Sequence, residues 1–515
     1  VSTPGRRLLR GGRVLAAGQG ACTALAVEDG TVTWVGDDDG ALRLLDGADE
    51  VVQLDGALVT PAFVDAHVHL AATGLNARGV DLGPARSRAE ALDLLAAHAR
   101  ASGDRVLFGY GWDDSEWPDG RFTGEQVDRA IGDRIGYVCR VDAHSAVVSG
   151  ALLRHAPHLA GQEGWDASGW ATRRAHEVVR LAVDEMISPA QRVEALRTAV
   201  RAAAVRGLAS VHELGAPHLS RIEDFAALDG LGREEPIVHV ARYWGERDAF
   251  GLVAPYRLLG LAGDLCCDGA IGSHTAALDA AYTDDPGNAG HLYLDADEVR
   301  DHVLACTRHG VQAGFHVIGD RAIDAVLEGF TAAARTVGTE VLRAARHRLE
   351  HAELLSAAAV RTLARLGLHA SVQPAFDRAW GGGGGLYETR LGPARAARMN
   401  PYAELARAGV PIALGSDTPV TPFDPWGAVR AACDHRTAGQ ALDPSAAFRA
   451  HTVGGWRAAG VDGHGRLAPG APATYAIWRA ADGYDDPVVE LLARAAADPP
   501  ACLRTVRDGV DLHTV

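Results

Sequence analysis

Residues 61–70, PAFVDAHVHL, combine a short apolar run with two histidines that are separated by one residue. The run at 62–67 has the length and composition of a buried strand. Side chains at positions i and i+2 of a strand project to the same side, so the imidazoles of His67 and His69 can meet one metal ion at the end of the strand. We therefore predict that this stretch is the first strand of a sheet that carries a metal site.

Seven further runs with the character of buried strands follow, and helical patterns separate several of them. Two of these helices begin with capping boxes, Ser188 with Gln191 and Asp295 with Glu298. Strands that alternate with helices in this number predict an α/β fold, a parallel (β/α)8 TIM barrel. The eight predicted strands cover 62–67, 209–214, 237–243, 264–269, 311–317, 346–351, 369–374 and 411–417.

Metal-ligand residue types recur at the ends of three later predicted strands. His316 closes the fifth strand, His351 the sixth and Asp417 the eighth. Barrel enzymes place their active sites at the carboxyl ends of their strands, which is the edge where these side chains would meet. Together with His67 and His69 they predict a site for a divalent metal, and zinc is the metal that we expect.

Two further units are predicted around the barrel. The segment after the first strand is too long for one strand-to-helix connection, so we expect an inserted α+β subdomain there. Both ends of the chain have strand-like runs around the turns Asp29-Gly30 and Asp508-Gly509, which predicts a small β-sandwich built from both ends. The predicted limits are 1–58 with 465–515 for the sandwich and 59–464 for the barrel, including 71–205 for the insertion.

Composition and charge narrow the classes of partner. Apolar residues make up 47% of the 515 residues and charged residues 23%, as in ordinary globular proteins. A net charge of −16 argues against nucleic acid and anionic membranes, which need a basic surface, and favours a small-molecule substrate.

We expect neither a membrane helix nor a signal peptide, because no apolar run is long enough. Seven scattered cysteines without a CxxC pair suit a reducing, cytoplasmic environment. The oligomeric state stays open, a homo-oligomer included.

Several longer motifs carry a resemblance to a known family. The motifs are PAFVDAHVHL (61–70), FHVIGDRAID (315–324), RHRLEHAEL (346–354) and ALGSDTPV (413–420), with further matches at 109–121, 140–149, 209–215 and 266–278. They resemble the amidohydrolase superfamily, specifically its amidohydrolase-3 branch, also called the YtcJ-like group, over nearly the whole chain. The resemblance implies that Asp417 is both a metal ligand and the proton shuttle. The remaining implied metal ligands are His67, His69, His316 and His351.

The chain departs from the family pattern at one position of the metal site. Many members carry a lysine on the fourth strand, four residues before an Asp-Gly pair, and its carboxylated side chain bridges two metals. Asp264 stands there, and the chain contains no lysine at all, so a carboxylated lysine is excluded. We favour one ion without a bridge; the alternatives are two ions bridged by Asp264 or Cys266, or a degraded site. Asp264, Cys266 and Asp268 would alternate onto one face of the strand.

A second group of residues is predicted to contact the substrate. Each has a structural alternative: a packed tryptophan at 112, hydrogen-bonded histidines at 144 and 212, or a surface ion pair at 320–321. Glu350 is expected on the strand face opposite His351, in a structural role. Arg173 and His274 replace residues typical of the family and are expected to influence substrate choice. The candidate substrate-binding residues are Trp112, Asp113, His144, His212, Asp320 and Arg321.

These inferences converge on one enzymatic prediction and two alternatives. We predict cleavage of a carbon–nitrogen bond, in an amide or cyclic amide, by metal-activated hydroxide with Asp417 as the proton shuttle. A deaminase or an esterase is the first alternative, because the same metal-activated hydroxide attacks the electrophilic carbon of their substrates as well. A catalytically silent protein that binds a metal or a small ligand is the second, and the missing lysine motivates it.

Overall fold

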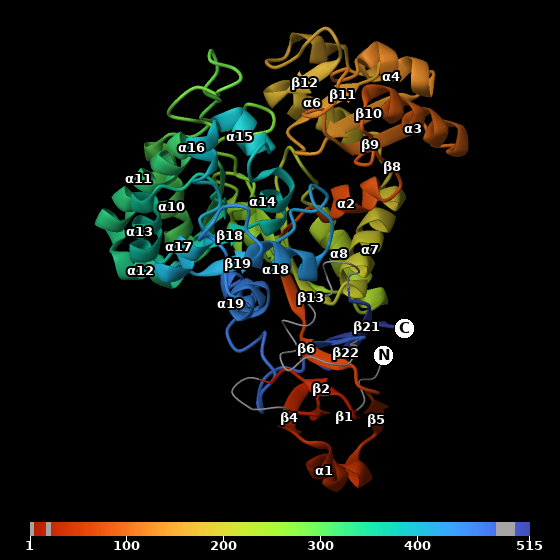
Figure 1. Cartoon of the computed structure of the whole chain (residues 1–515), viewed down its shortest axis with the longest axis vertical. Coiled ribbons are helices and arrows are strands. Elements are labelled where there is room, and N and C mark those ends of the chain that lie inside the picture. The colour runs from red at the N-terminus through yellow and green to blue at the C-terminus, as the bar shows by residue number, and fades with distance from the viewer. Residues whose placement is uncertain (1–4, 17–21, 480–499) are drawn as a thin grey trace.

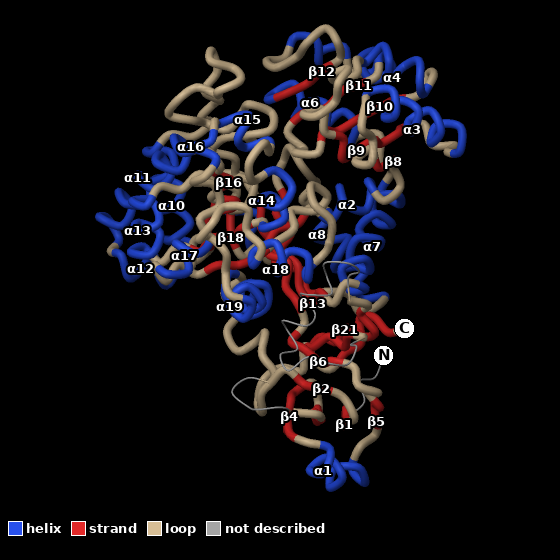
Figure 2. Tube along the Cα trace, in the orientation of Figure 1, coloured by secondary structure: helices blue, strands red, loops and turns tan. Residues whose placement is uncertain are grey.

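A barrel of parallel strands forms the centre of the molecule. The computed structural model describes residues 5–16, 22–479 and 500–515. Eight strands pair in the order β19-β18-β17-β16-β15-β14-β13-β7, and Figure 2 shows helices around them. This arrangement confirms the predicted (β/α)8 fold. The strands are β7 Phe63–Val68, β13 Leu208–Gly215, β14 His239–Trp244, β15 Gly260–Leu261, β16 Gln312–Val317, β17 Arg348–His351, β18 His369–Val372 and β19 Ile412–Leu414.

The two strands at the ends of this order, β7 and β19, are joined by the segment that follows β19. The amide of Asp417 donates to the carbonyl oxygen of His67 at 2.8 Å, and the amide of His69 donates to that of Thr418 at 2.9 Å. Val68 and Thr418 form a parallel bridge at the same place. The barrel is therefore completed at residues that were predicted to hold the metal.

The fourth strand differs from its prediction. It was expected at 264–269, but the residues that pair with β14 and β16 are Gly260 and Leu261 of β15. Gly263 has a φ of 89°, a conformation that a glycine adopts without strain and that ends the strand. The segment after it is irregular, and Cys266 contributes only an isolated bridge to His316. The apolar run predicted a strand because a buried irregular segment has the same composition.

Helices cover the outside of the barrel. Both predicted capping boxes form, and they fix the first residues of α7 and α10. In the part of the chain that the structure describes, no helix has the length and apolar character needed to span a bilayer. The helices are α2 Leu70–Asn76, α7 Pro189–Val205, α8 Asp224–Glu234, α9 Val253–Tyr256, α10 Ala296–His309, α11 Asp320–Val337, α12 Thr339–Ala345, α13 Ala357–Leu366, α14 Pro374–Trp380, α15 Leu386–Leu391, α16 Pro393–Ala396, α17 Tyr402–Arg407, α18 Pro425–Cys433, α19 Pro444–Arg449, the π-helical turn η4 Ala450–Gly454 and α20 Gly455–Ala458.

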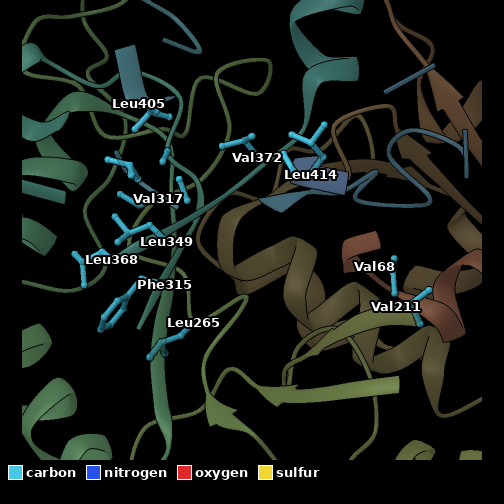
Figure 3. Packing of buried hydrophobic residues seen from close by; sticks show 14 of the residues in the cluster. Val68, Val211, Leu265, Phe315, Val317, Leu349, Leu368, Val372, Leu405 and Leu414 are labelled. Atoms are coloured by element: carbon cyan, nitrogen blue, oxygen red, sulfur yellow. The ribbon is translucent and has the colours of Figure 1, made fainter. Parts of the chain in front are cut away.

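Strand alternation separates the hydrophobic core from the polar interior of the barrel. Phe315 of β16 lies opposite Leu349 of β17 in the sheet register, and both belong to the main apolar cluster. Figure 3 shows them with Val317 among the buried side chains of this cluster. The residue between Phe315 and Val317 is His316, which therefore projects to the opposite face. The same strand thus packs apolar residues against the helices and directs a histidine inwards.

An inserted α+β subdomain separates β7 from β13, as Figure 1 shows in orange above the barrel. It contains a five-stranded sheet with the order β12-β11-β10-β9-β8. Its two apolar clusters are its own, so it packs as a unit above the mouth of the barrel. Its elements are β8 Val80–Asp81, α3 Arg88–Ala101, β9 Val106–Trp112, α4 Gly124–Ile131, β10 Ile135–Arg140, β11 Ser145–Val148, α5 Gly150–His155, β12 Trp170–Thr172 and α6 Arg173–Asp184.

Two smaller sheets lie at the opposite end of the barrel from the insertion (Figure 1). One has the order β4-β3-β1-β5; the other, β2-β6-β20-β21-β22, combines strands from both ends of the chain around a shared apolar cluster. The hairpins predicted at Asp29-Gly30 and Asp508-Gly509 are confirmed. Residues 1–4, 17–21 and 480–499, within the predicted sandwich, lie outside the described residues. The strands are β1 Arg6–Arg10, β2 Arg13–Val14, β3 Ala24–Glu28, β4 Thr31–Gly36, β5 Glu50–Gln53, β6 Leu58–Pro61, β20 Tyr475–Trp478, β21 Cys502–Arg507 and β22 Val510–Thr514; between β4 and β5 lies the short helix α1 Asp38–Ala41.

Candidate metal centre

The five predicted metal ligands converge at the carboxyl ends of the barrel strands. His67 lies in β7, His316 in β16 and His351 at the end of β17, while His69 and Asp417 follow β7 and β19. These residues and Asp264 form three overlapping groups. Within each group, one ligand atom from every residue lies within 4.8 Å of the others. The groups are His67, His69 and Asp264; His67, His351 and Asp417; and Asp264, His316 and His351. The structure therefore brings together all five residues that the sequence singled out.

Asp264 joins this set as a sixth member. One of its oxygens lies 3.1 Å from Nε2 of His69, and the other lies 3.5 Å from Nε2 of His67 and 3.7 Å from Nδ1 of His316. Asp264 follows the short strand β15 and Gly263, so the chain enters the site from an irregular segment and not from a strand face. It occupies the position at which the resembled family has its lysine.

Cys266, the other candidate bridge, is not in any of the three groups. Its Sγ lies 3.9 Å from Nε2 of His218 on the cavity wall. Asp268 has a structural role instead, because its carboxylate accepts hydrogen bonds from the amides of Ala277, Ile318 and Gly319. The alternation of Asp264, Cys266 and Asp268 onto one strand face was wrong, because no regular strand runs through these residues.

The chemistry of the six residues fits a divalent metal. Nε2 of His67, Nε2 of His351 and one oxygen each of Asp264 and Asp417 are buried and have no hydrogen-bond partner among the described residues. A buried polar atom without a partner costs on the order of 1–3 kcal/mol, more if charged, so such atoms gathered around one point are typical of a ligand site. Imidazole nitrogen and carboxylate oxygen are donors that zinc accepts.

The electric field of the site also favours a cation. Burial acts to lower the pKa of His69, but hydrogen bonds and charge from Asp264 and Asp417 raise it to about 9. Burial likewise opposes the shift at His67, where the same two carboxylates raise the pKa well above its usual value. Two buried carboxylates therefore attract positive charge to this point, and a metal ion would replace the protons there.

Residues behind the ligands orient them. Nδ1 of His67 lies 3.0 Å from Oε2 of Glu350, and Nδ1 of His351 lies 2.9 Å from Oε1 of Gln373. Arg348 donates to both oxygens of Glu350, at 2.5 and 3.0 Å. These contacts leave the Nε2 atoms of both histidines directed at the site. Glu350 thus positions a predicted metal ligand, a contact that the sequence did not predict.

A cavity of about 380 Å³ lies between these ligands and the inserted subdomain. His144, from the turn between β10 and β11, lines it, and its ring centroid is 5.2 Å from that of His316. The structure thus places His144 on the cavity wall, and its contact with a substrate stays a prediction. Helix α6 supplies much of the opposite wall, through Arg173, His176, Glu177, Arg180 and Asp184.

The other predicted substrate-binding residues do not line this cavity. Trp112 is fully buried in the core of the insertion, where its indole nitrogen donates to Val138, because strand β9 extends to this residue. Asp113 pairs with Arg140 at 2.5 Å. His212 lies beneath the site, where its Nδ1 accepts from Arg348 at 2.9 Å.

Asp320 and Arg321 begin α11 outside the cavity. Asp320 accepts a hydrogen bond from the amide of Asp279 at 3.0 Å, and Arg321 donates weakly to the backbone of Ala289 at 3.4 Å. These contacts fix a loop and do not reach His316. His274 likewise pairs with Asp284 at 3.0 Å, away from the cavity.

Arg180, His176, His218 and Tyr293 line the cavity and were not predicted. For Arg180 a signal existed, since it interrupts the apolar run of AHEVVRLAVD (175–184). An arginine among buried positions of a helix needs a partner or a function. His218 and Tyr293 come from irregular loops, for which periodicity gives no information.

Comparison with known proteins supplies independent information. A family model described as "Amidohydrolase family" matches residues 50–511. The chain is 26% identical to the Arabidopsis thaliana protein LONG AFTER FAR-RED 3, over 91% of this chain and 83% of that one. It is 27% identical to YtcJ of Bacillus subtilis (strain 168), over 82% of each. A solved structure of an uncharacterized metal-dependent hydrolase from Pyrococcus furiosus shares 25% identity at a TM-score of 0.72, covering 92% of this chain and 98% of that one.

Proposed function

The chain belongs to the amidohydrolase family, and from this membership we propose that it is a metal-dependent hydrolase that cleaves a carbon–nitrogen bond in an amide or cyclic amide. One observation carries the proposal: four imidazoles and two carboxylates meet beside a cavity that can admit a small molecule, and His67, His351, Asp264 and Asp417 each have a buried atom without a hydrogen-bond partner among the described residues. Pockets of this size and concavity are typical of small-molecule sites.

We propose one zinc ion, held by His67, His69, Asp264 and Asp417, with His316 and His351 beside it. The nitrogens of the first two histidines lie 3.1 to 3.5 Å from oxygens of the two carboxylates, so these four side chains would hold one ion together. Two ions that share Asp264 are the alternative.

When bound, the metal supplies a Lewis acid that polarises the scissile carbonyl and lowers the pKa of water. Asp417 accepts the proton of the attacking water and delivers it to the leaving nitrogen, which is general base and then general acid catalysis. Its carboxylate lines the cavity, so it lies where a substrate would react. Glu350 holds His67 in the tautomer that leaves Nε2 free.

The test is a metal analysis followed by a substrate panel. Mass spectrometry gives the metal content, and the zinc-loaded protein is then assayed with N-acyl amino acids, cyclic amides, amino-substituted heterocycles and esters. We expect the amides to be hydrolysed fastest, with activity lost on chelation and restored by zinc. Faster release of ammonia or faster ester cleavage would favour the deaminase or esterase. No turnover, together with thermal stabilisation by a panel member, would favour the silent binding protein.

A further inference from the structure

Arg180 of helix α6 lies in the cavity wall that faces the metal centre. Its guanidinium donates to the backbone carbonyl of Ala143. The next residue, His144, has its ring centroid 5.2 Å from that of the predicted metal ligand His316. Arg180 and the predicted ligands His316 and Asp417 thus line the same cavity.

The other arginines of the wall, Arg173 and Arg192, have partners of opposite charge, and so do the wall carboxylates of Asp142, Glu177 and Asp184. The structure gives Arg180 no ion pair with a carboxylate in residues 5–16, 22–479 or 500–515. Arg180 is thus the wall cation without a counter-charge in the described part of the chain. The paired groups are Arg173 with Glu163, Arg192 with Asp184 and Asp224, Glu177 with Arg174, and Asp142 with Arg140.

The groups that do contact Arg180 are neutral. Besides the Ala143 carbonyl, it lies against the hydroxyl of Tyr137 and the thiol of Cys139. Burial raises the pKa of the Tyr137 hydroxyl and of the Cys139 thiol, so neither supplies a negative charge near neutral pH. Burial also lowers the pKa of the neighbouring His176 well below its usual value, so that ring adds no second cation.

A partly buried guanidinium without a counter-ion is costly, because it has lost part of its hydration and gained no charge in return. Arginine recognises a carboxylate through two parallel N–H···O bonds, and one unpaired arginine matches the single charge of a carboxylate. A dianionic phosphate would carry one negative charge more than the guanidinium neutralises, which disfavours it. The cavity is therefore suited to a ligand with one carboxylate.

We propose that Arg180 is a specificity-determining residue that binds a carboxylate on the substrate, so that the substrate class is small amides bearing a carboxylate, such as N-acyl amino acids. This inference rests on the proposed function for the identity of the scissile bond, but the recognition of the carboxylate is independent of it. The carboxylate lies against α6 of the insertion while the amide lies at the barrel strands, so the two parts of the molecule hold opposite ends of the substrate.

The test compares two probes that differ only in the carboxylate: N-acetyl-leucine, as both enantiomers, and N-(3-methylbutyl)acetamide. Hydrolysis and calorimetric binding of each are measured with zinc-loaded wild type, Arg180→Met and Arg201→Met. Arg201 is the matched control, an exposed arginine on α7 that pairs with Glu235 outside the cavity. Methionine keeps most of the length of the side chain and removes its charge.

We expect the wild type to prefer N-acetyl-leucine, and Arg180→Met to weaken its binding or its kcat/KM by about 10- to 150-fold, the range for a hydrogen bond to a charged group. The neutral probe should change less than about 3-fold, and Arg201→Met should leave both values unchanged. Equal effects on the two probes, an equal loss in Arg201→Met, or no preference in the wild type would overturn the role of Arg180. Preferential binding of N-acetyl-leucine without hydrolysis, lost in Arg180→Met, would support the carboxylate site and count against the proposed hydrolase.

Discussion

Two carboxylates determine the charge of the metal centre at the scale of single residues. Asp264 and Asp417 each lie within 3.5 Å of nitrogens of His67 and His69. Because both are buried, their attraction for a cation is weakened little by water. An aspartate at position 264 therefore supplies negative charge where the family's usual lysine derivative would, although with a shorter side chain.

Asp417→Asn tests the proposed proton shuttle. An amide cannot accept a proton from water, so we expect kcat to fall by about 10² or more while the protein stays folded. Because Asp417 is also a proposed ligand, activity is expressed per bound zinc, with Asp93→Asn on the exposed face of α3 as the control. Undiminished turnover per zinc would exclude the shuttle role.

Glu350→Gln tests the positioning of His67. Loss of the charge that holds Nδ1 of His67 should weaken zinc binding by about 10- to 100-fold. Glu353→Gln is a matched control, since Glu353 is also buried but accepts a hydrogen bond from Tyr387, and burial raises its pKa to about 7. Competition with a fluorescent chelator measures both affinities. Similar affinities in the two variants would contradict the proposed role of Glu350.

The convergence of the five candidate ligands could be predicted from the sequence because strand ends meet at one edge of a barrel, whereas the residues that support them could not. Glu350 was assigned to the opposite face from His351 by strand alternation. His351 has a φ of 66°, so the strand turns at that residue and the alternation does not hold. The side chains of Glu350 and His351 therefore both reach His67. No sequence pattern predicts that a histidine adopts the left-handed backbone conformation.

At the scale of elements, helix α2 is held close to helix α7 by a glycine. A Cβ at Gly74 would lie 1.8 Å from the carbonyl oxygen of Ala195, so any side chain would push the helices apart. Helix α2 begins directly after His69, so its position affects a predicted ligand. Close packing at this point is needed for the geometry of the metal centre.

Gly74→Ala tests this packing against Gly230→Ala. We expect the first to lower the free energy of unfolding by about 2 kcal/mol or more through overpacking, and to weaken zinc binding. At Gly230 in α8 the nearest atom to a new Cβ is 3.9 Å away, so alanine should be neutral or stabilise by up to about 1 kcal/mol. Urea denaturation measures both, and a tolerated alanine at position 74 would show that the helices can separate freely.

His451 in the turn η4 should make strand β7 sensitive to acid. Burial lowers the pKa of His451 to about 4, and its Nδ1 lies 2.8 Å from the carbonyl oxygen of Val64 in β7. Because the unfolded chain binds a proton near pH 6.5 and the folded chain does not, this contribution is complete above about pH 6.5. It is lost as the pH falls towards 4, by up to about 3 kcal/mol.

Urea denaturation of wild type and His451→Gln between pH 7.5 and 4 tests this. The free energy of unfolding of the wild type should fall more steeply below pH 6.5, since glutamine does not titrate. Parallel pH dependences in the two proteins would show that His451 titrates alike in the folded and unfolded states.

Most helices and strands could be predicted from the sequence, and the fourth barrel strand is the exception. Capping boxes and hairpin turns are local, so Ser188 with Gln191 and the turn at Asp29-Gly30 appear as expected. The fourth strand was misplaced because the segment from Asp264 to Asp268 is ordered by distant amides, those of Ala277, Ile318 and Gly319, which local periodicity does not report.

At the scale of the whole molecule, metal binding should be linked to global stability. The four proposed ligands come from β7 and from the segments after β7, β15 and β19, so an ion bound to all of them ties distant parts of the chain together. The barrel and the family could be predicted from the sequence. The residues that line the cavity could not be predicted, because they depend on how the insertion packs above the barrel.

Removal of the metal tests this linkage. Chelation should lower the Tm, and free zinc at about 100 times its Kd should restore about 2.7 kcal/mol of stability. His67→Ala removes one ligand, so its Tm should respond little to zinc and its zinc content should be low. Calorimetric scans with and without zinc measure both proteins, and full zinc occupancy in His67→Ala would refute this histidine as a ligand.

The pairing of β6 with β20 has a consequence for biosynthesis. About 400 residues separate these antiparallel neighbours, so the sheet that contains both cannot form until β20 has also left the ribosome. At about 5–20 residues per second, the first strands wait roughly 20 to 80 s for their partners. During that interval their unpaired edges are exposed in the nascent chain and are open to pairing with other chains.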